Sequence, residues 1–257
     1  MKHGEASETA RRVAAHRLTF ERVAAPYGDP AADDRLARDV AGSVDIAGST
    51  ESMVAYLAAR TGFFDRVVFG ALERGLPQVV ITAAGYDGRA LRYAKAGVRW
   101  FEVDHPNTQH DKLERLERLA IDARHIAFVP ADFAVDGVAA ALAVGGHELA
   151  VPSLFLCEGI AIYLERPILE SLLQELRAAA AMGSRLAISL SLTTSSAAES
   201  VRRTAFRSAV AAMGEPARTV LSPDEVDALL RRTGWSVLPS SSERARLAGL
   251  VVVEPQA

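Results

Sequence analysis

The spacing of apolar residues along the chain changes character near residue 77. Before that point, apolar residues recur at intervals of three and four, which is typical of amphipathic helices. We expect helices there at Glu8 to Ala25, Ala31 to Val40, Glu51 to Arg60 and Phe63 to Arg74. Gly75 and Pro77 then end the helical pattern. The first 76 residues are therefore predicted to form an all-helical segment.

From Gln78 onward, short β-rich runs alternate with helical patterns, which indicates βαβ units and a parallel sheet. We expect seven strands, at Gln78 to Ala83, Arg99 to Val103, His125 to Val129, Ser153 to Cys157, Arg185 to Leu192, Ser236 to Leu238 and Leu250 to Val253. We expect helices at Gly88 to Lys95, Thr108 to Leu119, Val135 to Leu142, Arg166 to Ala181 and Pro223 to Arg232. The pattern predicts an α/β fold with a mostly parallel sheet and helices on both faces.

A Ser/Thr-rich stretch interrupts this alternation between residues 193 and 221. The helical pattern from Ala198 to Met213 predicts a cap inserted before the final strand pair. Ser222 and Glu225 have the spacing of a capping box at the start of the next helix. At 257 residues the chain fits one compact unit, with residues 1–76 as a helical cap on the substrate side and 77–257 as the ligand-binding domain.

The overall charge excludes some classes of partner. The chain has 29 basic and 32 acidic side chains, and this balance provides no broad positive field for nucleic acid. Cys157 is the single cysteine, so no internal disulfide framework is possible. The polar start and the lack of an apolar run of roughly 20 residues predict a cytoplasmic protein with no membrane partner. The scattered histidines predict no metal site.

The carboxyl ends of parallel strands are where ligands bind in an open α/β sheet. The first strand runs into the small residues of the segment Val79 to Arg89 and then into a helix. Small side chains let a ligand approach the backbone, and the helix start favours an anionic group. Taken alone, the segment is equally typical of an ordinary strand-to-helix turn.

Acidic residues follow the next three strands. Glu102 and Asp104 end the second strand, about 20 residues after the first loop, a separation at which a carboxylate meets a ribose diol. Asp132 follows the third strand and Glu158 the fourth. A carboxylate placed directly after a buried strand needs solvent or a hydrogen-bond donor. A ligand, a salt bridge or a helix N-terminus each meets that need.

Five segments occur in a fixed order along the chain. They are Tyr56 to Thr61, Ala83 to Arg89, Phe101 to Pro106, Pro130 to Phe133 and Cys157 to Leu164. Together they resemble the leucine carboxyl methyltransferase superfamily and its bacterial relatives. The resemblance implies a Rossmann-like class I methyltransferase fold in which S-adenosylmethionine lies across the strand ends.

The resemblance also implies roles at the methionine end of that cofactor. Arg60 is similar to the family arginine that holds the methionine carboxylate, a task suited to a guanidinium fork. Glu158 would lie near the methionine amino group, and Gly85 would line the cofactor. Relatives usually have Gly-Ala-Gly where this chain has Ala83-Ala84-Gly85. A methyl group at Ala83 costs on the order of 1 kcal/mol if the backbone there needs a positive φ, so weaker or altered cofactor binding is expected.

At the nucleoside end, the resemblance assigns the ribose hydroxyls to Asp104, with Glu102 nearby, and the adenine to Asp132 and Phe133. Glu102 and Asp104 also have an ordinary interpretation as solvated loop charge. For Asp132 the ordinary interpretation is a salt bridge or a helix N-cap.

Methyl transfer from a sulfonium depends mainly on alignment and on exclusion of water. A carboxylate acceptor needs no base, whereas a hydroxyl could use His105 or His110. Tyr163 could contact the acceptor or anchor the loop after the fourth strand. Surface placement is the ordinary interpretation of each histidine.

The leading hypothesis is O-methylation of a small-molecule acceptor, at a carboxylate or hydroxyl and in secondary metabolism, by a monomer or homodimer. One alternative keeps the fold and uses the pocket for a non-methylating reaction such as a cyclisation or elimination. A second alternative is an NAD(P)-dependent oxidoreductase, for which the full Gly-x-Gly-x-x-Gly pattern is missing.

Overall fold

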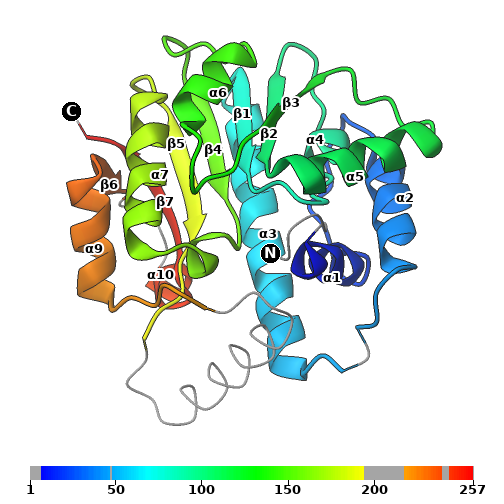
Figure 1. The fold of residues 1–257 in the computed structure, drawn as a ribbon, viewed down its shortest axis with the longest axis horizontal. Helices are drawn as coiled ribbons and strands as arrows, with labels where there is room; N and C mark the ends of the chain where they lie inside the picture. The colour runs from blue at the N-terminus through cyan, green and yellow to red at the C-terminus, as the bar shows by residue number, and fades with distance from the viewer. Residues whose placement is uncertain (1–6, 47, 194–216, 239–242, 257) are drawn as a thin grey trace.

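A computed structural model of the chain describes residues 7–46, 48–193, 217–238 and 243–256. Its seven described strands form one sheet in the order β3-β2-β1-β4-β5-β7-β6 (Figure 1). The strands are β1 Gln78–Thr82, β2 Arg99–Asp104, β3 Ile126–Pro130, β4 Ser153–Cys157, β5 Arg185–Ser189, β6 Trp235–Val237 and β7 Leu250–Pro255. Only β7 runs antiparallel to its neighbours β5 and β6. The predicted mostly parallel α/β fold is confirmed.

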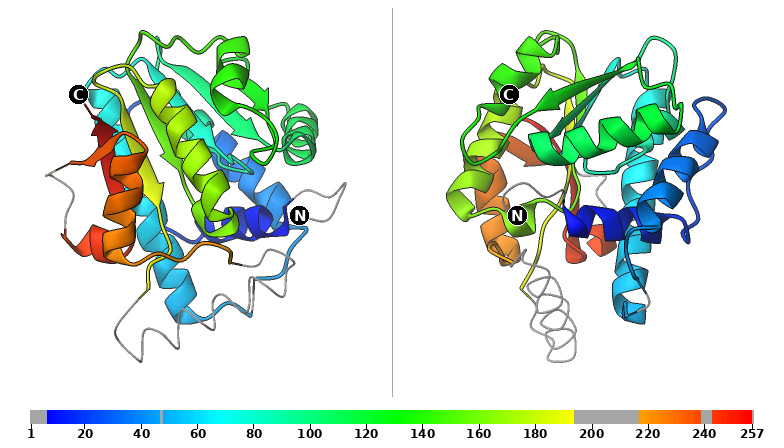
Figure 2. Two further views of the ribbon diagram at one scale, coloured as in Figure 1. Left: turned by 60° about the vertical axis from the view of Figure 1, so that its left-hand side comes forward. Right: turned by 45° about the vertical axis from the view of Figure 1, so that its right-hand side comes forward.

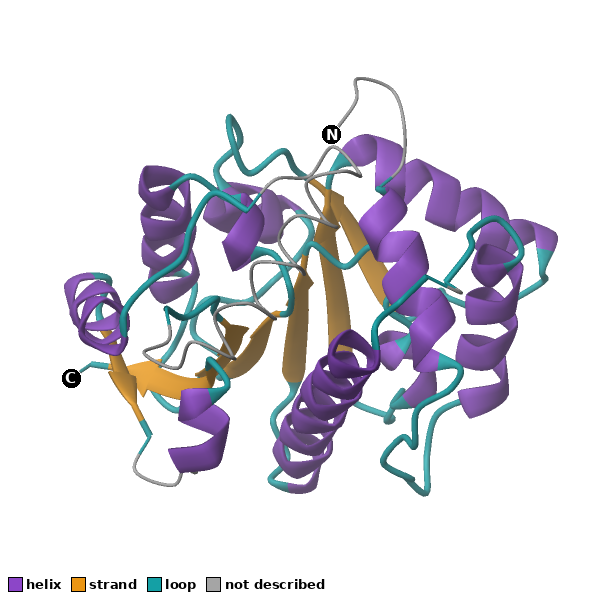
Figure 3. Cartoon of the chain, turned by 90° about the horizontal axis from the view of Figure 1, so that it is seen from below, coloured by secondary structure: helices purple, strands orange, loops and turns teal. Residues whose placement is uncertain are grey.

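Helices cover both faces of this sheet (Figures 2 and 3). Those in the described residues are α1 Glu8–Arg17, α2 Pro30–Ala41, α3 Glu51–Glu73, α4 Arg89–Arg92, α5 Pro106–Arg118, α6 Val138–Val144, the 3-10 turn η1 Ala161–Tyr163, α7 Arg166–Ala178, α9 Pro223–Arg232 and α10 Glu243–Leu247. The helix predicted from Ala198 to Met213 lies outside the described residues. No described helix is long and apolar enough to cross a membrane.

Alternate residues of the strands face two separate cores. Val80 of β1 packs in a cluster with α6, α7 and α9. Val79 and Ile81 point to the other face, into a cluster with α1 to α5. Because the N-terminal helices share this second cluster with the sheet, they are packed on the sheet and fix the position of any residue they direct toward the strand ends.

Two predicted helix boundaries in the N-terminal segment are wrong. The first helix ends at Arg17 instead of Ala25, and the chain beyond it directs Arg22 Nε to Asp65, 2.6 Å away. The predicted break between Arg60 and Phe63 is absent, because α3 continues as one helix of 23 residues. Phe64 and Val68 are fully buried, and this tertiary packing outweighs the weak helix propensity of Gly62, which lies at the predicted break.

Other boundaries differ less. Helix α4 is shorter than predicted, and α6 begins at Val138 instead of Val135 because Asp132 and Asp136 form a hydrogen-bonded turn. Strand β5 ends at Ser189, three residues earlier than predicted, and α10 was not predicted. The capping box at Ser222 and Glu225 is present in both directions.

Candidate functional site

Polar side chains gather at the carboxyl ends of β1, β2 and β4. Thr82 at the end of β1 pairs with Val103 of β2 and Cys157 of β4, so the three strands end at the same level. Helix α1 crosses this edge of the sheet (Figure 1). Of the predicted site residues, Asp104 is the last residue of β2 and Glu158 follows β4 directly.

The loop after β1 takes a left-handed backbone. Ala83 has φ 50° and Gly85 has φ 51°. A Cβ added to Gly85 would lie 2.9 Å from the Cβ of Ala10 on α1. The first loop therefore lies directly against α1, and only glycine fits at position 85.

Asp104 bridges the first loop and the start of α5. One of its carboxylate oxygens accepts a hydrogen bond from the Gly85 N–H, and the other accepts one from the His105 N–H at 2.6 Å. Burial raises the pKa of Asp104, while these two N–H groups oppose the rise. A carboxylate oxygen offers two lone pairs, so both oxygens can still accept a hydroxyl donor.

Glu102 lies two residues earlier on the same face of β2, and only 1% of it is exposed. Its Oε2 lies 2.5 Å from Lys112 Nζ, which also donates to the backbone oxygen of Asp87 at 2.7 Å. Burial raises the pKa of Glu102 to about 7, with Lys112 opposing the rise. The structure thus places Glu102 in the core, where its partner Lys112 ties α5 to the first loop, and leaves Asp104 as the more accessible of the two acids.

Glu158 follows β4 and is held by three arginines. Its Oε1 accepts from Arg60 Nε at 3.0 Å, and its Oε2 accepts from Arg17 Nη2 at 3.1 Å and Arg89 Nη1 at 2.5 Å. Burial alone would raise the pKa of Glu158, but the three guanidinium groups hold it well below its usual range. The carboxylate is therefore ionised at neutral pH.

Arg60 reaches Glu158 from α3, 98 residues away in sequence. Its guanidinium lies 5.7 Å from the ring centre of Tyr56, and the nearby Glu158, Tyr56 and Tyr163 raise its pKa against the effect of burial. Gly159 leaves room for it, since a Cβ there would lie 3.1 Å from Arg60 Nη1. Of the described residues, only Glu158 accepts a hydrogen bond from Arg60.

The acids and arginines around Glu158 extend into a buried network that the sequence analysis missed. Asp87 accepts from Arg17 Nη2 at 3.1 Å and from Arg89 Nη1 at 2.5 Å. Asp65 accepts from Arg89 Nε at 2.7 Å. Arg17 and Arg89 lie 141 and 69 residues from Glu158 in sequence. No local sequence pattern therefore indicates that these arginines pair with Glu158.

At the end of β3, Asp132 and Phe133 are both half-buried. Asp132 Oδ1 accepts from the Ala134 N–H at 2.9 Å, and the Asp132 N–H donates to Asp136 at 2.8 Å. Phe133 packs against the core cluster on the α7 face. In this arrangement Asp132 closes its own turn, and its assignment to adenine stays a prediction.

His105 is the N-cap of α5, and its Nδ1 accepts from the Asn107 N–H at 3.2 Å. In the neutral ring this leaves the proton on Nε2. His110 is exposed, 3.3 Å from Glu114. Tyr163 lies in η1 and is half-buried near Arg60.

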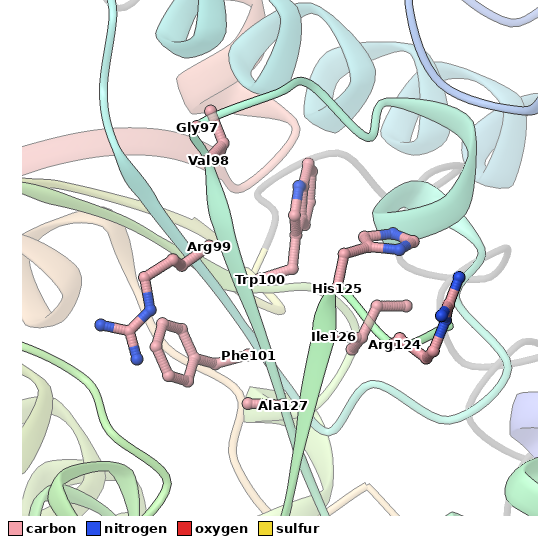
Figure 4. A pocket seen from close by; sticks show the side chains of 9 residues that line it. All are labelled: Gly97, Val98, Arg99, Trp100, Phe101, Arg124, His125, Ile126 and Ala127. Carbon is pink, nitrogen blue, oxygen red and sulfur yellow. The ribbon is translucent and has the colours of Figure 1, made fainter. Parts of the chain in front are cut away.

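Two other features carry no catalytic chemistry. Burial raises the pKa of Cys157 to about 12, so its thiol stays protonated. Figure 4 shows a hollow around Trp100 and His125, at the starts of β2 and β3 and away from the carboxyl ends. Within the described ranges, no three potential metal ligands come together.

Comparison with known proteins identifies the family. A sequence model of leucine carboxyl methyltransferases matches residues 4–177. The chain belongs to this family. The resemblance read from the sequence is thereby confirmed, and the five segments that carry it lie within the matched residues.

Two relatives of this leucine carboxyl methyltransferase family member carry the name "Putative S-adenosyl-L-methionine-dependent methyltransferase". One, from Mycolicibacterium paratuberculosis, is 36% identical over 199 residues, which cover 75% of this chain and 63% of the relative. The other, from Mycolicibacterium smegmatis, is 35% identical over 211 residues, which cover 75% of this chain and 65% of the relative. The chain thus spans less than two thirds of the length of these relatives.

Solved structures agree on the fold of the family member. A DUF574 family protein from Streptomyces avermitilis superimposes with a TM-score of 0.62 at 16% identity, over 99% of each chain. Magnesium protoporphyrin IX methyltransferase from Synechocystis PCC 6803, solved with bound SAH, gives 0.55 at 13% identity, over 87% of this chain and 94% of the other. The sheet order and these neighbours establish the class I methyltransferase fold.

Proposed function

We propose that this protein is an S-adenosylmethionine-dependent methyltransferase that methylates an oxygen of a small-molecule acceptor. One observation carries the proposal: Arg60 and Glu158 are paired at the end of β4, while Asp104 lies at the end of β2 with lone pairs to spare. The cofactor has a carboxylate, an ammonium and a ribose diol. These three residues offer matching chemistry.

The hydrogen-bond capacity of the pair fits the methionine end. The three arginine N–H groups use three of the roughly four lone-pair positions of Glu158, which leaves one for an ammonium. Arg60 uses Nε for Glu158, so its two terminal nitrogens can grip a carboxylate as a fork. Asp104 would receive the ribose hydroxyls.

The bound cofactor would supply an electrophilic methyl group on its sulfonium. The residues of the chain would align the acceptor and exclude water. His105 uses its Nδ1 lone pair to cap α5 and is not poised to take a proton. This favours an acceptor that is already anionic, and we therefore place a carboxylate ahead of a hydroxyl.

A second candidate, a non-methylating reaction on the same fold, draws support from Ala83. Its φ of 50° and the packing of Ala10 against Gly85 both tighten the loop where the cofactor would lie. Product mass distinguishes the two candidates, because methylation adds one CH₂ to the acceptor.

The binding test is calorimetric titration of S-adenosylmethionine into the wild-type protein and Asp104→Ala. We expect binding to the wild type and loss of most of the affinity in the variant. Asp122→Ala is the control, since Asp122 pairs with Arg124 on the surface and should bind as the wild type does. The proposal fails if the wild type does not bind, or if Asp104→Ala binds equally well.

A further inference from the structure

Arg89 has no exposed side-chain surface, and neither has its partner Asp65 in the network around Glu158. Arg89 belongs to α4, directly after the first loop. Its guanidinium contacts Asp65 on α3, Asp87 in the loop and Glu158 after β4, and Nη2 donates to the Thr61 backbone oxygen at 3.2 Å. One side chain therefore joins three separate elements of the fold.

Arg60 and Glu158 form the methionine-end pair, and Arg89 contacts Glu158 directly and the neighbour of Arg60 in α3. Glu158 is contacted directly, at 2.5 Å. Arg60 is positioned indirectly, because Arg89 donates to the backbone oxygen of Thr61, the residue that follows Arg60 in α3. The distance between α3 and the end of β4 is thus fixed by a rigid fork between them.

A guanidinium suits this task in a way that an ammonium does not. Its planar fork presents five N–H donors in fixed directions, whereas lysine is a single point charge on a flexible stem. Arg89 uses its three nitrogens for four acceptors from three elements. Lysine would keep the charge and lose that geometry.

We propose that Arg89 is a positioning residue that fixes Glu158 and Arg60 in the geometry needed to recognise the amino-acid end of S-adenosylmethionine. The inference rests on the proposed function and adds to it a residue that does not touch the ligand. Since Arg89 contacts Glu158 directly and makes no contact with Asp104, its effect should be largest for ligands that carry the amino-acid group.

The test compares S-adenosylhomocysteine with 5′-methylthioadenosine, which has the nucleoside and lacks the amino-acid group. In Arg89→Lys we expect affinity for S-adenosylhomocysteine to fall about tenfold, the equivalent of one charge-assisted hydrogen bond. Affinity for 5′-methylthioadenosine should stay within about twofold of the wild type, because Asp104 is unaffected.

The matched control is Arg22→Lys. Arg22 is another buried arginine of the network, bonded to Asp65 and Asp33 and not to Glu158. It should lower the unfolding temperature as Arg89→Lys does, and leave the ratio of the two affinities unchanged. Asp65→Asn is a second variant that keeps Arg89 and removes the negative charge of its side-chain partner on α3; we expect a smaller loss of affinity for S-adenosylhomocysteine, with affinity for 5′-methylthioadenosine again unchanged.

The outcomes separate the two proposals. If the wild type binds neither ligand, the proposed function fails and this inference fails with it. If the wild type binds both ligands, equal losses for both in Arg89→Lys, or the same selective loss in Arg22→Lys, overturn the positioning role and leave the methyltransferase proposal standing. Should Arg89→Lys not fold, unchanged selectivity in Asp65→Asn overturns it.

Discussion

At the scale of single residues, Ala83 is held in a backbone conformation that favours glycine, with φ 50°. A left-handed conformation costs a residue with a Cβ roughly 1–2 kcal/mol, and part of the gain from glycine is lost to the extra freedom of the unfolded chain. We expect Ala83→Gly to raise the free energy of unfolding by about 0.5–1 kcal/mol, as measured by urea denaturation.

Ala120 separates the effect on stability from the effect on the site. It has nearly the same conformation, with φ 49°, and lies beyond the end of α5. Ala120→Gly should give a similar gain in stability with no change in affinity for S-adenosylmethionine, whereas Ala83→Gly should also strengthen binding. A loss of stability in both variants would contradict the interpretation of these backbone angles.

Glu102 predicts a pH dependence of stability. Burial raises its pKa from 4.5 to about 7 in the folded state, so folding favours the protonated form and the unfolding free energy falls as pH rises from about 4.5 to 7. Glu102→Gln lacks this contribution. Relative to the wild type, the variant should gain on the order of 2 kcal/mol between pH 5 and pH 8, at about 1.4 kcal/mol per pKa unit. Urea denaturation at several pH values measures the difference, and a constant difference would refute the assignment.

The sequence could place some site residues and not others. Asp104 and Glu158 could be predicted as site residues, because a carboxylate at the end of a buried strand must find a donor or a ligand. Arg17 and Arg89 could not be predicted, because their partners depend on how α1 and α4 pack against the end of β4. The spacing of Glu102 and Asp104 did not separate the two acids; the resemblance favoured Asp104, and the structure shows that Glu102 is the one buried in the core.

At the scale of elements, Gly62 lies inside α3, where the structure has one continuous helix. A Cβ there would lie 3.2 Å from the end of the flexible Arg66 side chain, which can move. Alanine in a helix interior is better than glycine by about 0.5–1 kcal/mol, so Gly62→Ala should raise the unfolding free energy by that amount.

Gly145, at the end of α6, provides a contrast. A Cβ there would lie 2.7 Å from Cγ2 of the buried Val129, so Gly145→Ala should destabilise the protein by about 1–3 kcal/mol through overpacking. Chemical denaturation of the two variants side by side tests both signs. Equal effects would mean that local contacts do not decide the outcome.

The strands were easier to predict than the helix ends. A buried parallel strand is a short apolar run bounded by turn residues, and β4 was predicted with its observed bounds. The end of α1 at Arg17 and the continuity of α3 through Gly62 are set by contacts between distant residues. Local periodicity does not contain that information.

At the scale of the whole molecule, the sheet separates two cores that share its strands. The chain has two tryptophans, and they divide between the cores: Trp235 lies in the cluster with α7 and α9, and Trp100 in the cluster with α2 and α3. Both are at most 1% exposed. Each therefore reports on the packing of one face of the sheet.

Because β1, β2 and β4 contribute side chains to both clusters, we expect the two cores to unfold together. Trp100→Phe and Trp235→Phe each leave one fluorescent probe, and in each variant we expect the fluorescence transition in urea to coincide with that of far-ultraviolet circular dichroism. S-adenosylmethionine at 100 times its dissociation constant should raise the unfolding free energy reported by each probe by about 2.7 kcal/mol. The ligand contacts proposed for Arg60 and Glu158 join the helical N-terminal segment to the strand ends, so the ligand should act on both faces. A separate, earlier transition of the Trp100 probe would show instead that this segment and its face of the sheet form an independent unit.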